Sequence, residues 1–195
     1  LLMNPKADVK ATICHTSTEN LDIIPANIDL SAAEVQLVNE VARESALARV
    51  LRHVESDYDV VLIDCQPSLG LLAVNALTAA HGVIVPVEAE FFALRGVALL
   101  VETIETVRDR INPRLKIDGI VATMVDSRTL HSREVLQRLQ EAFGDLVFDT
   151  RIGRTIKFPD ASVATEPIIS YAPNHAGAHA YRRLAREVIA RGDAA

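Results

Sequence analysis

Aromatic residues, cysteines and long apolar runs are all scarce in this sequence. Tryptophan is absent and aromatic residues make up 4% of the 195 residues, which argues against a surface that stacks on the bases of single-stranded nucleic acid. The two cysteines, Cys14 and Cys65, are too few for a disulfide framework and lack the spacing of a metal cluster. No apolar run approaches the length that crosses a bilayer. We therefore expect a globular protein of the reducing cytoplasm, with no membrane contact.

A phosphate-binding loop is also missing. No GxxxxGK[ST] motif occurs, and none of the four lysines, Lys6, Lys10, Lys116 and Lys157, follows a glycine. The sequence opens on Leu1 instead of methionine. For a nucleotide hydrolase, we would expect the first strand, the phosphate loop and the first helix to lie upstream of this sequence.

Charge is unevenly distributed along the chain. The formal net charge is −6, which argues weakly against nucleic acid. Residues 1–107 hold 6 basic and 15 acidic side chains, whereas residues 108–195 hold 14 basic and 11 acidic ones. Phosphate binding needs a local basic cluster and not a basic total. The second half therefore either carries a phosphate-binding surface or has arginines spread over solvated helix faces.

Apolar runs bounded by turn residues alternate with segments of helical periodicity. The runs are Leu21–Ile24, Val60–Ile63, Val83–Val87, Ile117–Val125, Leu146–Phe148 and Ile168–Ile169. The helical segments are Ser31–Val54, which opens with a Ser-x-x-Glu capping box, Phe91–Ile111, Ser132–Phe143 and Ala178–Arg191. Such alternation predicts a single α/β domain over residues 1–195, with a mostly parallel sheet and helices on both faces.

The most informative stretch is DYDVVLIDCQPSLGLLAVNAL, residues 57–77. The unbroken apolar run Val60–Ile63 predicts a strand buried on both faces, and Asp64 follows it directly. Ligands of open α/β sheets bind at the carboxyl ends of strands, where a Walker B aspartate orders Mg²⁺ beside nucleotide phosphates. Asp64 is therefore the candidate catalytic and Mg²⁺-ordering residue, acting through the water shell of the ion. The alternative is an ordinary strand followed by an Asx turn.

Five ordered blocks make the sequence resemble the ParA/Soj family of chromosome- and plasmid-partitioning ATPases, which are P-loop proteins related to MinD. The blocks are NLDIIPANIDLSAAEVQLV, YDVVLIDCQPSLGLLAVNALTAA, GVIVPVEAEFFALRG, TMVDSRTLHSREV and PDASVATEPIISYAPNHAGAHAYRRLAREV. The resemblance implies a P-loop NTPase fold that here lacks its first β–P-loop–α unit. It also implies Mg·ATP as cofactor, ATP-dependent homodimers, binding of double-stranded DNA without sequence preference, a ParB-like partner and a nucleoid-associated location.

The same resemblance assigns roles to six further residues. Arg128 matches a family arginine implicated in contact with the DNA backbone, and Lys157, with Arg154 close by, matches a second basic position of that surface. The adenine is implied to lie near Met124, Asp126 and the loop that contains Gly153. From the sequence alone, solvated basic side chains and a core methionine remain the alternatives.

The missing KGGxGKT loop leaves two functional hypotheses. Either the sequence belongs to a competent ATPase, or it is a non-catalytic interaction module that binds a ParB-like or chromosome-organising partner. The coding sequence upstream of Leu1 would discriminate between them.

Overall fold

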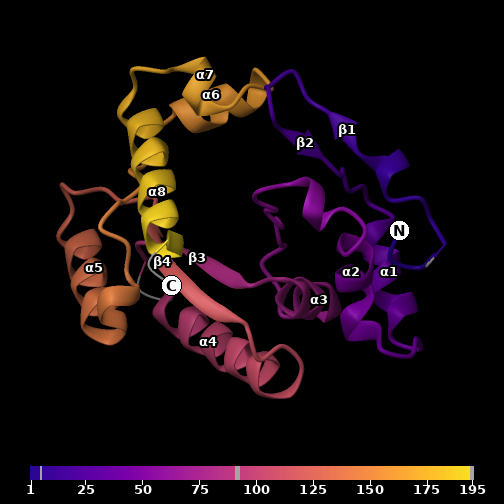
Figure 1. Ribbon diagram of the computed structural model, residues 1–195. Coiled ribbons are helices and arrows are strands. Elements are labelled where there is room, and N and C mark those ends of the chain that lie inside the picture. The colour runs from indigo at the N-terminus through magenta and orange to yellow at the C-terminus, as the bar shows by residue number, and fades with distance from the viewer. Residues whose placement is uncertain (5, 91–92, 194–195) are drawn as a thin grey trace. The chain divides into compact units, whose positions relative to one another are not determined.

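The computed structural model describes residues 1–4, 6–90 and 93–193 (Figure 1). Two compact units make up the chain: Leu1–His81 with Thr103–Leu115, and Gly82–Glu102 with Lys116–Ala195. The strands are β1 (Cys14–His15), β2 (Asp22–Ile23), β3 (Gly82–Glu88) and β4 (Lys116–Thr123). The α-helices are α1 (Leu30–Leu37), α2 (Ala46–Leu51), α3 (Leu71–Ala79), α4 (Ala93–Arg110), α5 (Leu130–Phe143), α6 (Lys157–Val163), α7 (Ile168–Tyr171) and α8 (Ala176–Asp193).

The second unit is built on a parallel pair of strands. β3 and β4 run in register from Gly82 opposite Lys116 to Glu88 opposite Thr123, with one irregularity after Val83. Parallel strands need a crossover connection, and α4 lies between them in the chain. The predicted strands Val83–Val87 and Ile117–Val125 are thereby confirmed in position, and so is the parallel α/β fold class.

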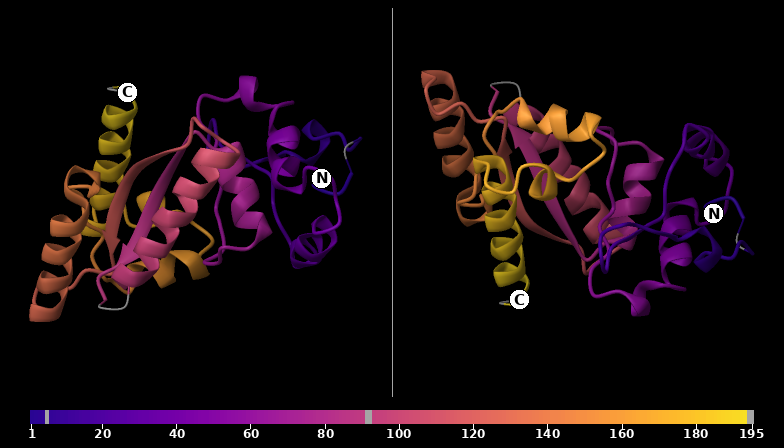
Figure 2. Two further views of the ribbon diagram at one scale, coloured as in Figure 1. Left: turned by 90° about the horizontal axis from the view of Figure 1, so that it is seen from below. Right: turned by 90° about the horizontal axis from the view of Figure 1, so that it is seen from above.

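Helices cover both faces of this strand pair (Figure 2). Alternate residues of β4 point to opposite sides. Ile120 and Ala122 pack with residues of α4 and α5 in one core cluster, whereas Val121 packs with residues of α8 in another. Both faces of the pair are therefore buried, as apolar runs without alternation require.

A third segment, residues 147–153, runs alongside β4 without forming a strand of its own. Phe148 N–H donates to Ile120 O at 2.8 Å, and Ile152 N–H donates to Ala122 O at 2.9 Å. Bridges join Val147 to Ile120 and Gly153 to Val125. Leu146 ends a 3-10 helix, Gly144–Leu146, and only Val147 and Phe148 of the apolar run Leu146–Phe148 lie extended beside β4. Val147 makes an isolated bridge, so the run does not form the predicted strand.

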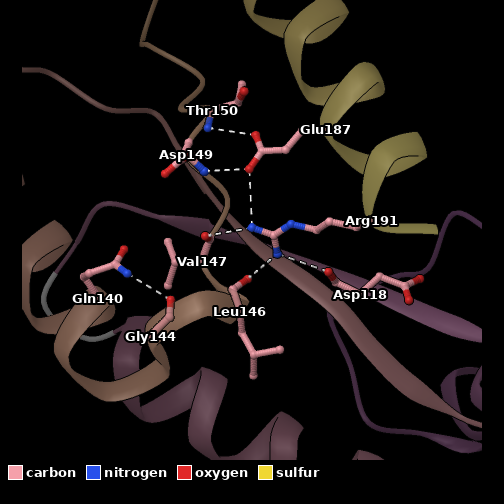
Figure 3. Close-up of polar contacts among 9 residues, drawn as sticks. All are labelled: Asp118, Gln140, Gly144, Leu146, Val147, Asp149, Thr150, Glu187 and Arg191. Atoms are coloured by element: carbon pink, nitrogen blue, oxygen red, sulfur yellow. Dashed lines mark hydrogen bonds and ion pairs between the residues drawn. The ribbon is translucent and has the colours of Figure 1, made fainter. Parts of the chain in front are cut away.

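Two side chains of α8 hold this segment in place (Figure 3). The Glu187 carboxylate accepts the backbone N–H groups of Asp149 and Thr150 at 2.8 and 3.0 Å. Burial raises the pKa of Glu187, but these hydrogen bonds and nearby Arg191 outweigh it, so the net pKa is lowered.

Arg191 completes the arrangement, which we call the α8 clasp (Glu187 and Arg191). Its guanidinium donates to the carbonyls of Asp118, Leu146 and Val147 at 3.0 to 3.3 Å and lies 4.1 Å from the centroid of the Phe148 ring. The clasp satisfies backbone groups that a neighbouring strand would otherwise satisfy.

The first unit holds a two-residue antiparallel pair, β1 with β2. Asp22 of β2 accepts the Tyr58 hydroxyl at 2.7 Å and lies 2.6 Å from Nδ1 of His15. The hydrogen bonds from His15 and Tyr58 lower the pKa of Asp22, and the bond to Asp22 raises that of Tyr58. The apolar run Leu21–Ile24 is thus part of a small hairpin and does not join the parallel sheet.

The predicted strand Val60–Ile63 is wrong. The segment has no regular secondary structure, no strand among the described residues pairs with it, and Val60 and Leu62 are 71% and 84% exposed. A buried parallel strand needs hydrogen-bonded neighbours and cover on both faces, and neither is present here. Asp64 therefore follows an exposed segment, not a buried strand.

The predicted helix Ser31–Val54 is broken into α1 and α2. Ala42 takes a left-handed φ of 53°, which interrupts the helix, and the carbonyls at the break accept from arginines: Val38 O from Arg43 and Ala42 O from Arg49. The capping box is also wrong, because the N-cap is Asp29 without a side-chain hydrogen bond. Glu34 is engaged elsewhere, as described below.

The other helices differ less from expectation. α5 and α8 confirm the segments Ser132–Phe143 and Ala178–Arg191 to within two residues at each end, and α4 confirms Phe91–Ile111 apart from residues 91–92, which lie outside the described residues. The run Ile168–Ile169 was wrongly expected to be a strand. It begins α7 directly after Pro167, a residue that favours the start of a helix. None of the described helices combines the length and apolar character that spanning a bilayer would require.

Candidate functional site

The carboxyl end of β4 gathers five of the seven candidate residues. Beyond the strand, Val125 N–H donates to Ile152 O and Arg154 N–H donates to Val125 O, each at 3.1 Å. This pairing brings Gly153 and Arg154 beside the segment that begins at Met124. Residues about thirty positions apart in the sequence therefore share one edge of the fold.

Met124 is not a core residue. Its side chain is 44% exposed, and its φ of 54° is left-handed, which is uncommon for a residue with a side chain. The core interpretation of Met124 is therefore wrong, and an exposed apolar side chain at the strand end remains available for contact with a ligand.

Asp126 and Arg128 form a two-pronged ion pair. Arg128 Nε and Nη2 donate to the two carboxylate oxygens of Asp126 at 2.9 and 2.7 Å, and the Arg128 backbone N–H donates to Oδ1 at 3.1 Å. The side chain of Arg128 is 87% exposed and that of Asp126 is 29% exposed. The hydrogen bonds from Arg128 and the positive charge of Arg154 lower the pKa of Asp126 to about 2.

The start of α5 fixes the backbone beneath this pair. Thr129 is the N-cap, and its hydroxyl accepts the Ser132 N–H at 3.2 Å while donating to Asp126 O at 3.0 Å. Buried Ser132 in turn accepts the Asp126 N–H at 3.3 Å. Neither Thr129 nor Ser132 is among the candidate residues of the sequence, although threonine just before a helical segment is a favoured N-cap.

Lys157 is engaged separately at the start of α6. Its ammonium lies 3.0 Å from Asp160 and 5.9 Å from the centroid of the Tyr171 ring. The hydrogen bond to Asp160 raises the pKa of Lys157, so it stays charged at neutral pH. Lys157 belongs to the same unit as Arg128 but makes none of the contacts that join Asp126, Arg128 and Arg154.

Asp64 lies in the first unit, in the loop that leads to α3. Glu34 reaches this loop from α1: its carboxylate accepts from Gln66 Nε2 and from the Leu72 N–H, each at 3.4 Å. A side chain at Gly70 would place its Cβ against Glu34 Oε1, so Gly70 leaves the room that the carboxylate occupies. The sequence signal assigned to a local cap in α1 thus serves the start of α3.

Asp64 does not belong to a cluster of metal-ligating side chains in the described part of the chain. No group of three or more His, Cys, Asp or Glu side chains converges within residues 1–4, 6–90 and 93–193. Mg²⁺ keeps several waters and takes one or two carboxylates with substrate phosphates, so Asp64 fits a water-mediated contact. Without a phosphate loop, these residues alone do not make an ATP site.

Comparison with known proteins identifies the family. A family model described as AAA domain matches residues 1–117. The chromosome-partitioning ATPase Soj of Treponema pallidum is 45% identical over 190 residues, covering 97% of this chain and 75% of that protein. The chain belongs to the ParA/Soj family.

Other ParA/Soj comparisons bear on length and fold. The uncharacterized protein MT1749 of Mycobacterium tuberculosis is 59% identical over 191 residues, covering 98% of this chain but only 60% of MT1749. Cobyrinic acid a,c-diamide synthase of Mycobacterium smegmatis, solved with an ATP analog and magnesium, has a TM-score of 0.79 at 40% identity and covers 93% of this chain and 67% of that one. The chain thus has the α/β fold of P-loop NTPases and spans about three fifths of MT1749.

Proposed function

We propose that this chain belongs to a partitioning ATPase that dimerises with ATP and binds double-stranded DNA without sequence preference. The observation that carries the proposal is the arginine-bearing edge at the end of β4, where Arg128 is exposed and Arg154 is close enough to act on the same carboxylate. Guanidinium groups bind phosphate oxygens in a fork geometry without reading bases. Lys157, whose side chain is 41% exposed, adds a third cation in the same unit.

We take residues 1–195 to be one ATPase domain, and we propose that it binds Mg·ATP. Met124, Asp126 and Gly153 would lie near the adenine. Asp64 would hold Mg²⁺ through water, and the ion would supply positive charge to the phosphates. The similar synthase structure, solved with an ATP analog and magnesium, supports this cofactor.

The partners and location follow from the family. We propose a homodimer, a ParB-like protein that stimulates hydrolysis, and a cytoplasmic, nucleoid-associated protein. Soj of Treponema pallidum, named as a chromosome-partitioning ATPase, supports this assignment.

DNA binding is tested in the full-length protein by fluorescence anisotropy on two unrelated duplexes at low salt with Mg·ATP. Arg128→Glu and Lys157→Glu should each weaken binding equally for both duplexes. Neutralising Arg128 with Gln should lower the slope of log K against log salt by about one per chain. Arg186→Glu, an exposed arginine of α8, is the matched control. Arg128→Glu that binds as the control does would refute the assignment.

A second candidate function is a binding module without hydrolysis, and the absence of a GxxxxGK[ST] motif in the sequence favours it. Isothermal titration of the 195-residue chain with Mg·ATP should show no micromolar affinity, because no lysine or glycine-rich loop cradles the phosphates. Micromolar affinity abolished by Asp64→Ala would instead support the ATPase on this chain alone.

A further inference from the structure

The Asp126 carboxylate occupies the Nε–Nη2 side of the Arg128 guanidinium, one of the two forks with which arginine binds a phosphate. Both guanidinium prongs point at its two oxygens, at 2.9 and 2.7 Å. A phosphate presents a similar pair of acceptor oxygens to arginine. One guanidinium cannot use the same two N–H groups on both anions at once.

The carboxylate is the fixed member of the pair. The Arg128 N–H holds Asp126 Oδ1 at 3.1 Å, and the Asp126 backbone is held at both ends, by Ser132 at its N–H and by Thr129 at its carbonyl. The Arg128 side chain, by contrast, is 87% exposed and hydrogen-bonded in the described structure through this carboxylate. Arg128 is therefore the member that can turn away toward a phosphate.

Arg154 is a second cation on which the Asp126 carboxylate acts. Its positive charge also acts on the Asp126 carboxylate, so one internal anion faces two of the three basic side chains proposed to contact DNA. A carboxylate whose charge acts on both cations reduces the positive potential that the edge offers to phosphate.

We propose that Asp126 competes with DNA phosphate for Arg128 and thereby sets how tightly the edge binds DNA. This inference rests on the DNA-binding role proposed above. A ligand bound at the end of β4 would then act on Arg128 through Asp126. A group that hydrogen-bonds the Asp126 carboxylate would free Arg128 for DNA, and the loss of that group would restore the Asp126–Arg128 ion pair.

The test replaces Asp126 by Asn, which keeps a side-chain oxygen for the Arg128 N–H and favours the same turn. Anisotropy titrations with an unrelated duplex at about 0.1 M salt should show binding tighter than wild type by about two- to fivefold, the range expected for loss of an exposed ion pair. Asp145→Asn, which removes one exposed carboxylate from the same unit, controls for net charge. Thermal unfolding followed by circular dichroism checks that each variant is folded.

The double variant separates the two proposals. In Arg128→Gln, adding Asp126→Asn should give no further gain beyond that of Asp145→Asn, because the competed cation is gone. If Asp126→Asn binds as Asp145→Asn does while Arg128→Gln weakens binding, the competition is wrong and the DNA-binding role stands. If Arg128→Gln binds as wild type, both are wrong.

Discussion

Removing Arg191 should cost more stability than removing any exposed arginine of α8. Arg191→Ala deletes three hydrogen bonds to the carbonyls of Asp118, Leu146 and Val147, one to Glu187, and the contact with the Phe148 ring. Each carbonyl bond contributes about 1 kcal/mol net, and the cation–π contact about 0.5–1 kcal/mol. The side chain is 28% exposed, so water replaces part of what is lost. We expect the free energy of unfolding to fall by about 2–3 kcal/mol.

The assay is urea unfolding followed by far-ultraviolet circular dichroism, with Arg186→Ala as control because it removes the same charge from an exposed position of the same helix. That control should change stability by at most about 0.5 kcal/mol. The difference should persist in about 1 M salt, since short-range hydrogen bonds to carbonyls are screened less than exposed ion pairs. Equal midpoints for the two variants would show that the clasp does not stabilise the fold.

Three further changes test other parts of the structure. Glu34→Ala and Gly70→Ala should each lower the free energy of unfolding by about 0.5–2 kcal/mol, as loss of a helix cap does. If both act through the contact of Glu34 with the start of α3, the double variant should lose no more stability than the worse single variant. Gly119→Ala should destabilise by about 1–3 kcal/mol in urea unfolding, because its Cβ would overlap the Phe148 ring. The pKa of Asp126 is lowered to about 2. The contribution of its ion pair to stability should therefore be complete above the unfolded pKa of about 3.9 and be lost as the pH falls toward 2. A carboxyl ¹³C titration of Asp126 with a midpoint near 4 would contradict this.

The sequence predicted the second unit better than the first. The strands Val83–Val87 and Ile117–Val125 were predictable because two-sided burial leaves an unbroken apolar run, and α5 and α8 because a helix with one buried face has a clear period. Asp126, Arg128 and Arg154 could be grouped only through the family resemblance. No spacing in the chain indicates that Arg154 N–H meets Val125 O.

The failures share a physical cause. Val60–Ile63 has the composition of a buried strand, but strand formation depends on neighbours that composition does not report. The Ser-x-x-Glu pattern beginning at Ser31 was assigned to a cap of its own helix, whereas Glu34 hydrogen-bonds Leu72 N–H, 38 positions away. A side chain with two nearby hydrogen-bonding choices cannot be assigned from local sequence alone.

The α8 clasp has a consequence for assembly. The outer rim of a sheet offers a row of donors and acceptors that recruits strands from other molecules. Here Glu187 accepts hydrogen bonds from two backbone N–H groups of the segment beside β4, and Arg191 donates to two of its carbonyls. Side chains that occupy these donors and acceptors protect the protein from edge-to-edge aggregation.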